Sequence, residues 1–373
     1  MELAPFRIEH YYGRHEFTAE YMLSSSDAET VTVAGLLALE PGATDRLGSQ
    51  RLGYTESPGA PALREAVASI YETCAADDVL VLSSAEEGIF AAYHALLRPG
   101  DHVVVETPCY ESALELARST GAEVTEWRRR YADGWGHELD ELEHLLRPDT
   151  RLVYVNTPHN PTGTLMPRVV LESLVELCAE RDGWLFCDEV YRELEHDPDD
   201  RLPAACDLYE RALSLGSMSK TYGLPGLRLG WLASRDRAAL ARVLDFKYYT
   251  TICSSAPSEL LSELAIRHRD VLAGRNRAIV LANLPLLDAF FERHADTFSW
   301  VRPTASPIGF PRVEGVGDVT AFCERLVAET GVLLLPGAVY DEPDHVRFGY
   351  GRANMPEALA RLDEWLGPGL VAR

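Results

Sequence analysis

The sequence predicts an α/β fold with a large domain, in which a mainly parallel sheet lies between helices, a smaller α+β domain and an N-terminal arm. Three observations indicate it. Short apolar runs alternate with helical patterns over residues 79–216, which is typical of a parallel sheet with helices on both faces. The chain has 373 residues, more than one hydrophobic core usually accommodates. A glycine-rich loop follows the last apolar run, where α/β proteins place their ligands.

Glycine and proline separate the expected strands from the helices between them. The segment Arg-Pro-Gly-Asp at 98–101 ends a helix that begins near Ala85, because Gly adopts the left-handed cap conformation and Pro does not continue a helix. Arg-Pro-Asp at 147–149 has the same effect before the fourth strand. We therefore expect six strands, at residues 79–82, 102–106, 123–127, 152–156, 184–188 and 212–216.

The remaining segments define the expected domain organisation. A long helical pattern over 259–284 leaves the sheet region, and a smaller mixture of strands and helices follows it. The first 40 residues carry no strong period. We expect an arm over 1–40 that packs on the small domain or on a neighbouring subunit, a large domain over 41–270 and a small domain over 271–373.

Composition excludes several classes of partner. The fractions of hydrophobic and charged residues are ordinary for a soluble globular protein, and the net charge of −23 repels nucleic acid and anionic membranes. Seven scattered cysteines form no Cys-x-x-Cys pair, so we expect reduced thiols and no metal site. No apolar run approaches the length of a membrane span and no leader pattern opens the chain, so we expect a cytoplasmic protein.

The segment over 217–231 carries the most informative chemistry. It follows the sixth predicted strand and contains Lys220 and, eight residues later, Arg228. A lysine among small residues is most often simply solvated. Here the glycine-bracketed stretch can bring an amine and a guanidinium around one phosphate-bearing carbonyl compound.

This segment resembles the cofactor-lysine signature of the class I and II aminotransferases, the aspartate aminotransferase-like enzymes of fold type I, and the resemblance extends along almost the whole chain. These enzymes use pyridoxal 5′-phosphate (PLP). The resemblance implies that Lys220 holds PLP as a Schiff base and that Ser217, Ser219 and Arg228 bind its phosphate. An arginine fork and short hydroxyls are suitable donors to a phosphate dianion.

Two further motifs match residues that contact the cofactor ring in this family. Asp188 ends the fifth predicted strand; taken alone it is equally well a helix cap. The resemblance implies that Asp188 keeps the ring nitrogen protonated, which makes the ring an electron sink, and that Tyr191 binds the phenolic oxygen. Asn160, in the turn Asn-Pro-Thr-Gly, matches the second partner of that oxygen and a substrate contact, whereas we expect His159 to be structural.

The phosphate and ring contacts continue upstream. The segment Ser-Ser-Ala-Glu-Glu-Gly at 83–88 lies between a strand and a helix, where free amides hold phosphate or a serine simply caps the helix. The resemblance implies that Ser84, Ala85 and Glu86 bind the phosphate, with Glu86 contributing its backbone because its carboxylate repels the ligand. Tyr110 matches the aromatic residue that stacks on the pyridine ring.

Two residues outside these motifs complete the implied site. Tyr54 matches a tyrosine that reaches the phosphate of a partner subunit, which implies a homodimer with shared active sites. Arg347, which in isolation is equally well a surface charge, matches the arginine that grips the substrate α-carboxylate with two parallel hydrogen bonds.

The resemblance implies a class I/II aminotransferase that moves the amino group of an L-α-amino acid to a 2-oxo acid. The family's Gly-Glu-Pro-like loop is replaced here by Leu-Ser-Ser-Ser-Asp at 23–27, and this serine run resembles capreomycidine synthase-like enzymes, which cyclise an arginine derivative on the same scaffold. A cyclase, β-lyase or oxidase therefore stands as the alternative, because fold and cofactor do not fix the reaction.

The side-chain pocket is expected to come from the arm, and the arm also argues against a regulator. We expect His10, Tyr11, Tyr12, Arg14 and the serines at 24–26 to select the substrate. A transcription regulator with a PLP-binding domain is disfavoured, because only about 40 residues precede the predicted fold, too few for a DNA-binding module.

Overall fold

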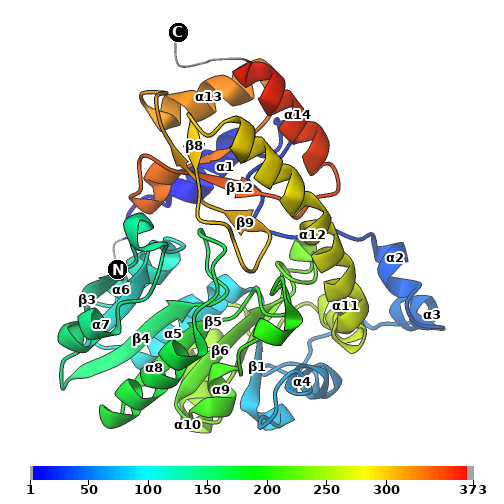
Figure 1. Ribbon diagram of the computed structural model, residues 1–373. Helices are drawn as coiled ribbons and strands as arrows, with labels where there is room; N and C mark the ends of the chain where they lie inside the picture. Colours follow the sequence, from blue (N-terminus) through cyan, green and yellow to red (C-terminus); the bar gives the residue numbers. More distant parts are fainter. Residues whose placement is uncertain (1–2, 368–373) are drawn as a thin grey trace.

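The computed structural model describes residues 3–367. The centre of the molecule is a seven-stranded sheet (Figure 1). Its strands are β1 (Val79–Leu82), β2 (His102–Thr107), β3 (Glu123–Arg128), β4 (Thr150–Asn156), β5 (Trp184–Asp188), β6 (Ala212–Ser217) and β7 (Gly230–Ala233). They lie in the order β1-β7-β6-β5-β4-β2-β3. Neighbours are parallel except at β7, which is antiparallel to both β1 and β6. The predicted α/β class and the six predicted strands are confirmed.

Strand β7 is not among the predicted strands, because it has four residues and begins inside the glycine-rich loop. Its glycine neighbours make the close packing possible. A Cβ atom on Gly216 of β6 would lie 2.3 Å from the ring of Trp231, and one on Gly230 would lie 2.7 Å from the backbone nitrogen of Ala85. Both positions therefore require glycine, and β7 lies directly against the segment that opens the next helix.

Alternate residues of the strands point to opposite faces of the sheet. On β4, Leu152 and Tyr154 pack with α5, α6 and α10, whereas Val153 and Val155 pack with α7 and α8. Because both faces are buried, the strands read as continuous apolar runs. The helices around the sheet are α4 (Pro61–Ala68), α5 (Ala85–Leu96), α6 (Ser112–Ser119), α7 (Leu139–Leu145), α8 (Arg168–Glu180), α9 (Ala205–Leu208), α10 (Arg237–Lys247) and α11 (Ala256–Arg267).

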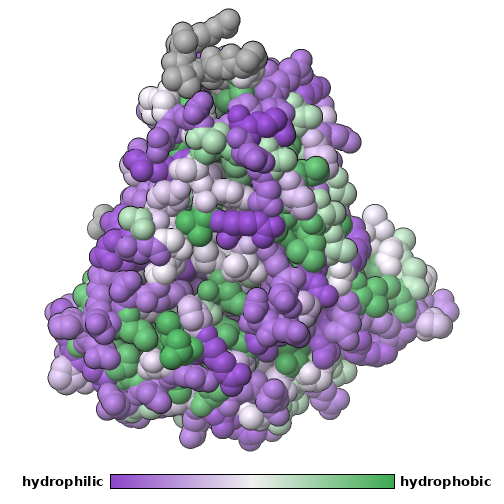
Figure 2. Space-filling model, viewed as in Figure 1, coloured by the Kyte–Doolittle hydropathy of each residue, from purple (hydrophilic) through white to green (hydrophobic). Residues whose placement is uncertain are grey.

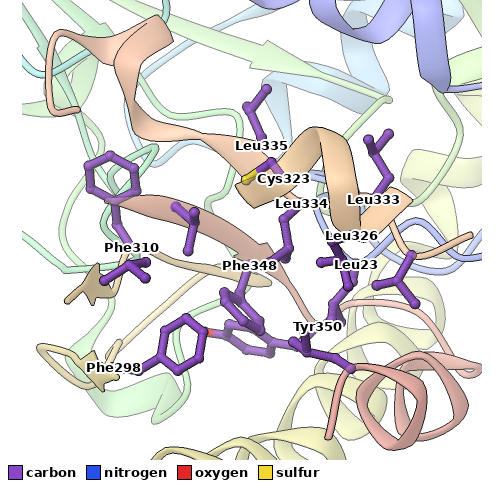
Figure 3. Close-up of a cluster of buried hydrophobic side chains, with 14 of the residues drawn as sticks. Leu23, Phe298, Phe310, Cys323, Leu326, Leu333, Leu334, Leu335, Phe348 and Tyr350 are labelled. Atoms are coloured by element: carbon purple, nitrogen blue, oxygen red, sulfur yellow. The ribbon is translucent and has the colours of Figure 1, made fainter. Parts of the chain in front are cut away.

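A second core fills the upper part of the molecule, which α12 (Arg269–Arg293) reaches from the sheet region (Figure 1), and Val280, Leu284 and Phe290 of α12 are buried in it. Phe298, Phe348 and Tyr350 are packed at its centre, and Leu23 joins them from the N-terminal segment (Figure 3). Ile8 and Tyr11 of α1 are buried in the same cluster. The elements here are α1 (Arg7–His15), α12 (Arg269–Arg293), α13 (Val319–Thr330), α14 (Met355–Leu366), β8 (Phe298–Ser299), β9 (Ile308–Gly309), β10 (Arg312–Val313), β11 (Leu335–Pro336) and β12 (Val346–Gly349).

The first part of the N-terminal segment, with α1 and Leu23, thus belongs to the upper core. Helices α2 (Val33–Leu37) and α3 (Ala43–Gly48) follow it, although the sequence shows no strong period there, and Leu36 and Ala43 pack instead in a core with residues of α4 and α11. The division of the chain at residues 40 and 270 stays a prediction.

The prediction of one long helix over 259–284 is wrong. The chain leaves helical geometry at His268, with φ −110° and ψ 24°, so α11 and α12 are separate helices. The side chains of Arg267 and His268 both reach the carboxylate of Glu40, which anchors the break. Helix α12 then continues through Pro285 to Arg293.

The surface, the helices and the cysteines can be compared with the expectations from composition. Hydrophilic residues predominate on the face in Figure 2, and the hydrophobic ones form small separate patches. Within residues 3–367, no helix combines the length and the apolar character that crossing a membrane requires. All seven cysteines are free thiols, and five of them are buried.

Candidate active site

A cavity of about 510 Å³ opens at the carboxyl ends of β4, β5 and β6, beside the N-terminus of α5. This is the edge where α/β sheets bind ligands. Tyr54 and Arg347 do not line it. The structure brings together the other predicted site residues, which are Ser84, Ala85, Glu86, Tyr110, Asn160, Asp188, Tyr191, Ser217, Ser219, Lys220 and Arg228.

Lys220 lies just beyond β6 and extends into the cavity from the sheet edge. Its Nζ donates a hydrogen bond of 2.8 Å to Oγ of Ser26. Burial lowers the pKa of Lys220, an effect that the nearby carboxylate of Asp27 partly offsets. A lysine with a lowered pKa has a larger neutral fraction, and the neutral amine is the nucleophile that attacks a carbonyl group.

Asp188 ends β5 and is fixed on both sides. One carboxylate oxygen accepts a hydrogen bond of 3.0 Å from the hydroxyl of Tyr154, and the other accepts one of 3.2 Å from the backbone of Val190. Burial raises the pKa of Asp188 to about 6. Because burial disfavours the ionised form of Asp188, a cationic partner such as a protonated ring nitrogen would stabilise that form strongly.

Two candidate donors for a phenolic oxygen lie next to Asp188. The hydroxyl of Tyr191 is buried and has no hydrogen-bond partner among the described residues. The backbone nitrogen of Asn160 donates to Oδ1 of Asn156 at 2.7 Å, and Nδ2 of Asn156 donates to the backbone oxygen of Asp188 at 2.8 Å. Asn156 therefore ties together the two segments that carry Asp188 and Asn160.

The N-terminus of α5 forms the opposite end of the cavity. Ser84 caps the helix, with its Oγ accepting a hydrogen bond of 3.1 Å from the backbone of Glu87. The free backbone amides at the N-terminus of α5 and the helix dipole favour the binding of an anion there. Burial raises the pKa of Glu86 to about 7, which weakens the charge that repels such an anion near neutral pH. Arg228, in a left-handed conformation with φ 48°, faces the same space.

Arg347 lies behind the cavity wall and is 1% exposed. Its Nε and Nη2 donate to the backbone oxygen of Ser24 at 3.2 and 3.0 Å, and Nη2 also donates to the hydroxyl of Tyr12 at 2.6 Å. Its Nη1 donates to Oδ1 of Asn160 at 3.1 Å and to the hydroxyl of Tyr340. Every nitrogen of the guanidinium is thus bonded to protein groups.

Comparison with known proteins identifies the family. The model of the family described as aminotransferase class I and II matches residues 22–362. The chain belongs to the class I and II aminotransferases. Its cofactor is PLP, and its fold is fold type I.

Relatives of this chain differ in the reactions that their names give. Capreomycidine synthase of Streptomyces vinaceus is 33% identical, over 96% of this chain and 93% of its own length. A PLP-dependent aminotransferase from Streptococcus suis has a TM-score of 0.93 at 31% identity, with 98% of both chains covered. The PLP-dependent cyclase OrfR has a TM-score of 0.91 at 30% identity, also with 98% of both chains covered.

The groups around the cavity fit PLP. Lys220 offers an amine to the aldehyde and Asp188 offers a carboxylate to the ring nitrogen. The unpartnered hydroxyl of Tyr191 can bind the phenolic oxygen, and the capped N-terminus of α5 can bind the phosphate together with Arg228. Each polar group of the cofactor thus has a partner of matching chemistry on the cavity wall.

An acidic wall, formed by Glu9, Glu16 and Asp27, is absent from the sequence predictions. All three line the cavity from the N-terminal segment. Nη2 of Arg352 donates to both carboxylate oxygens of Asp27 at 2.9 Å, and the hydroxyl of Tyr110 donates to Glu9 at 2.5 Å. Glu9 and Glu16 are seven residues apart, and this spacing places both on one face of a helix. The spacing is the sequence signal that could have indicated a common position for the two side chains.

The expected side-chain selectors divide into two groups. Tyr12, Ser25 and Ser26 line the cavity. Tyr11 is instead buried in the upper core, since α1 turns that face inward, and His10 and Arg14 point away from the cavity residues.

Tyr54 projects away from the cavity of its own chain and is 92% exposed. The loop that carries it is nevertheless held firmly. Nζ of Lys247 donates to the backbone oxygen of Ser57 at 2.7 Å, and Glu259 accepts hydrogen bonds of 2.9 Å from Thr55 Oγ1 and from the backbone of Ala60. Leu52, two residues before Tyr54, is also exposed. So are Tyr248, Tyr249 and Ile252, in the segment that precedes Ser254, whose backbone oxygen accepts a hydrogen bond from Thr55.

Proposed function

We propose that this chain transfers the amino group of an L-α-amino acid with a positively charged side chain to a 2-oxo acid. The observation that carries the proposal is the acidic wall of Glu9, Glu16 and Asp27, which lines the same cavity as Lys220. Arg352 pairs with Asp27, and the wall keeps an excess of negative charge. Such a surface attracts a cation and repels an acidic side chain.

Each residue of the site has its own part in the chemistry. When bound, PLP supplies a ring that accepts the electrons of the Cα–H bond. Lys220 would hold the cofactor covalently, and its amine is the group that would take up and give back a proton at the substrate Cα. Asp188 would hold a proton on the ring nitrogen of the bound cofactor. Arg347 pairs with the α-carboxylate after Tyr12 or Ser24 moves, which orients Cα for proton removal.

Cyclisation of the amino acid is the second candidate. Two observations favour it: the similarity to capreomycidine synthase and to the cyclase OrfR, and the contact of Lys220 with Ser26 in the serine run. Both reactions need the same removal of the α-proton and differ only in their later steps, so the residues assigned above serve either outcome.

A panel of amino acids tests the substrate and the reaction together. The holoenzyme is mixed with arginine, lysine, ornithine, aspartate, leucine and a basic amino acid that carries a hydroxyl group on Cβ, because ring closure at Cβ without an oxidant needs a leaving group there. The absorbance of the cofactor is followed, and the 2-oxo acid, ammonia, peroxide and cyclised products are measured. Transamination predicts the pyridoxamine form and a 2-oxo acid with the basic amino acids. A cyclised product without the pyridoxamine form establishes the second candidate, and a preference for aspartate overturns the proposed substrate class.

Neutralising the acidic wall is expected to lower kcat/KM for basic amino acids by about 10- to 100-fold for each carboxylate replaced, because a charge-assisted hydrogen bond contributes roughly 1.5–3 kcal/mol. The variants are Glu9→Gln and Asp27→Asn, measured by steady-state kinetics with arginine and with leucine. Rates with leucine should change little. Glu20→Gln, an exposed carboxylate outside the cavity, is the matched control. Equal losses with arginine and leucine would contradict a role in side-chain recognition.

Tyr54 is expected to complete the active site of a partner subunit in a twofold dimer. Lys220→Ala and Tyr54→Ala chains, each defective alone, are mixed under conditions that exchange subunits. Each heterodimer then contains one intact site, so about a quarter of the wild-type activity should return in a statistical mixture. The activity is assayed after native mass spectrometry has verified exchange. If verified heterodimers stay inactive, Tyr54 does not act across the interface.

A further inference from the structure

A buried polar cluster lies directly beneath the cavity and contains residues that the proposed mechanism does not use. Glu106, at the end of β2, is 1% exposed and accepts a hydrogen bond of 2.8 Å from Nε2 of His137. Nη1 of Arg129 lies 3.4 Å from the same carboxylate oxygen. The imidazole and the guanidinium come from the segment after β3, so the cluster joins two neighbouring strands.

The second oxygen of Glu106 points to the active-site loop. It accepts a hydrogen bond of 2.9 Å from the backbone nitrogen of Asn156. Asn156 in turn bonds to the backbone of Asp188 and receives the backbone N–H of Asn160. One buried carboxylate thus fixes the residue that connects two predicted ring contacts.

The far end of the same loop is held by Arg129. Its Nη2 donates to Oγ1 of Thr164 at 2.6 Å, and that hydroxyl lies 2.7 Å from Oγ1 of Thr162. Thr162 is bonded to Nδ1 of His159 at 2.8 Å. The loop over 156–164 is therefore attached to the Glu106–Arg129 pair at both of its ends.

Charge explains why the carboxylate of Glu106 suits this position. Burial opposes its ionisation, but the rings of His159 and His137 and the guanidinium of Arg129 outweigh that effect and lower the pKa of Glu106 to about 2. An ionised carboxylate accepts stronger hydrogen bonds than a neutral group, and a buried ion pair loses much of its value if one partner is removed.

We propose that Glu106 is a positioning residue that, through Asn156, sets the place of Asn160 against the phenolic oxygen of PLP. The inference rests on the proposed site assignment of Asn160. Glu106 touches neither substrate nor cofactor, and its effect is transmitted by the hydrogen bonds of the loop over 156–164.

The first test uses the cofactor as its own reporter. The pH midpoint of the absorbance change of the Lys220-bound cofactor is measured in the holoenzyme for wild type, Glu106→Gln, Asn160→Ala and the double variant. A donor on the phenolic oxygen lowers that midpoint, so each single variant should raise it, by about one pH unit for a tenfold change in proton affinity. If Glu106 acts through Asn160, the double variant shifts no further than Asn160→Ala.

The controls separate positioning from stability. Glu263→Gln removes another buried glutamate, one paired with Arg46 and Arg267, and should leave the midpoint unchanged. Glu106→Asp keeps the charge but is too short to reach both partners, and it supplies a second variant if Glu106→Gln folds poorly. Where Asn160→Ala does move the midpoint, a wild-type midpoint in the folded Glu106 variants, or additive shifts in the double variant, overturns the proposal.

Hydrogen exchange measures the loop independently of the cofactor contact. In the holoenzyme, amide protection over 156–164 should fall in Glu106→Gln and stay unchanged in Glu263→Gln. Unchanged protection of this loop in Glu106→Gln also overturns the proposal. If Asn160→Ala fails to move the midpoint while loop protection still depends on Glu106, the assignment of Asn160 to the phenolic oxygen is wrong and the positioning of the loop by Glu106 stands.

Discussion

Replacing Lys220 with alanine is expected to abolish turnover while the protein still folds. Among the described residues that line the cavity, Lys220 is the only lysine, so no neighbour can supply the amine that binds the cofactor. The side chain makes a single hydrogen bond, to Ser26, and its loss leaves the cores intact. Borohydride reduction followed by dialysis and an absorbance scan measures covalent attachment directly.

The control for this variant is Ser26→Ala, which removes the hydrogen-bond partner of Lys220 and keeps the amine. It should retain the cofactor band after reduction and dialysis. If Lys220→Ala also keeps that band, another residue attaches the cofactor and the central assignment is wrong.

Replacing Asp188 with asparagine is expected to leave PLP bound but to slow removal of the α-proton by several orders of magnitude. The amide does not hold a proton on the ring nitrogen, and a neutral pyridine accepts electrons poorly. Exchange of the Cα proton with deuterated solvent, followed in single turnovers, measures this step apart from product release.

Glu189→Gln is the matched control for Asp188→Asn. Glu189 is the next residue and is also buried, but its carboxylate faces the backbone of Ala205 and the hydroxyl of Ser214 rather than the cavity. Exchange should stay near the wild-type rate in this control. If Asp188→Asn exchanges the Cα proton at the wild-type rate, the carboxylate of Asp188 has no part in proton removal.

Local signals in the sequence were sufficient for the sheet and for one side of the site. Asp188 and Lys220 follow apolar strands directly, so strand direction alone brings them to one edge. Strand β7 was not predicted, because the glycines around it are also typical of a loop. His268 carries no helix-breaking signal in the sequence, and the contact of its ring with Glu40 joins residues more than two hundred positions apart.

The opposite side of the site depends on contacts between distant parts of the chain. Glu9 reaches the cavity because α1 packs on the upper core, and no local pattern shows where such a helix lies. Asp27 gains its place from Arg352, more than three hundred residues away. The bonds that engage Arg347 likewise come from residues 12 and 24, so sequence motifs could identify the arginine but not its surroundings.

If Arg347 pairs with the substrate carboxylate as proposed, its engaged guanidinium makes substrate binding a competition. Tyr12 and Ser24 already supply the oxygens that a carboxylate brings, so a ligand gains only the difference between its own bonds and theirs. The apparent affinity falls by the fraction of molecules in which the guanidinium is free. A small amino acid that offers little beyond its carboxylate is therefore held weakly. An amino acid whose side chain reaches Asp27 or Glu9 gains additional binding free energy there, which offsets the loss at Arg347. Discrimination between ligands therefore depends on both ends of the molecule.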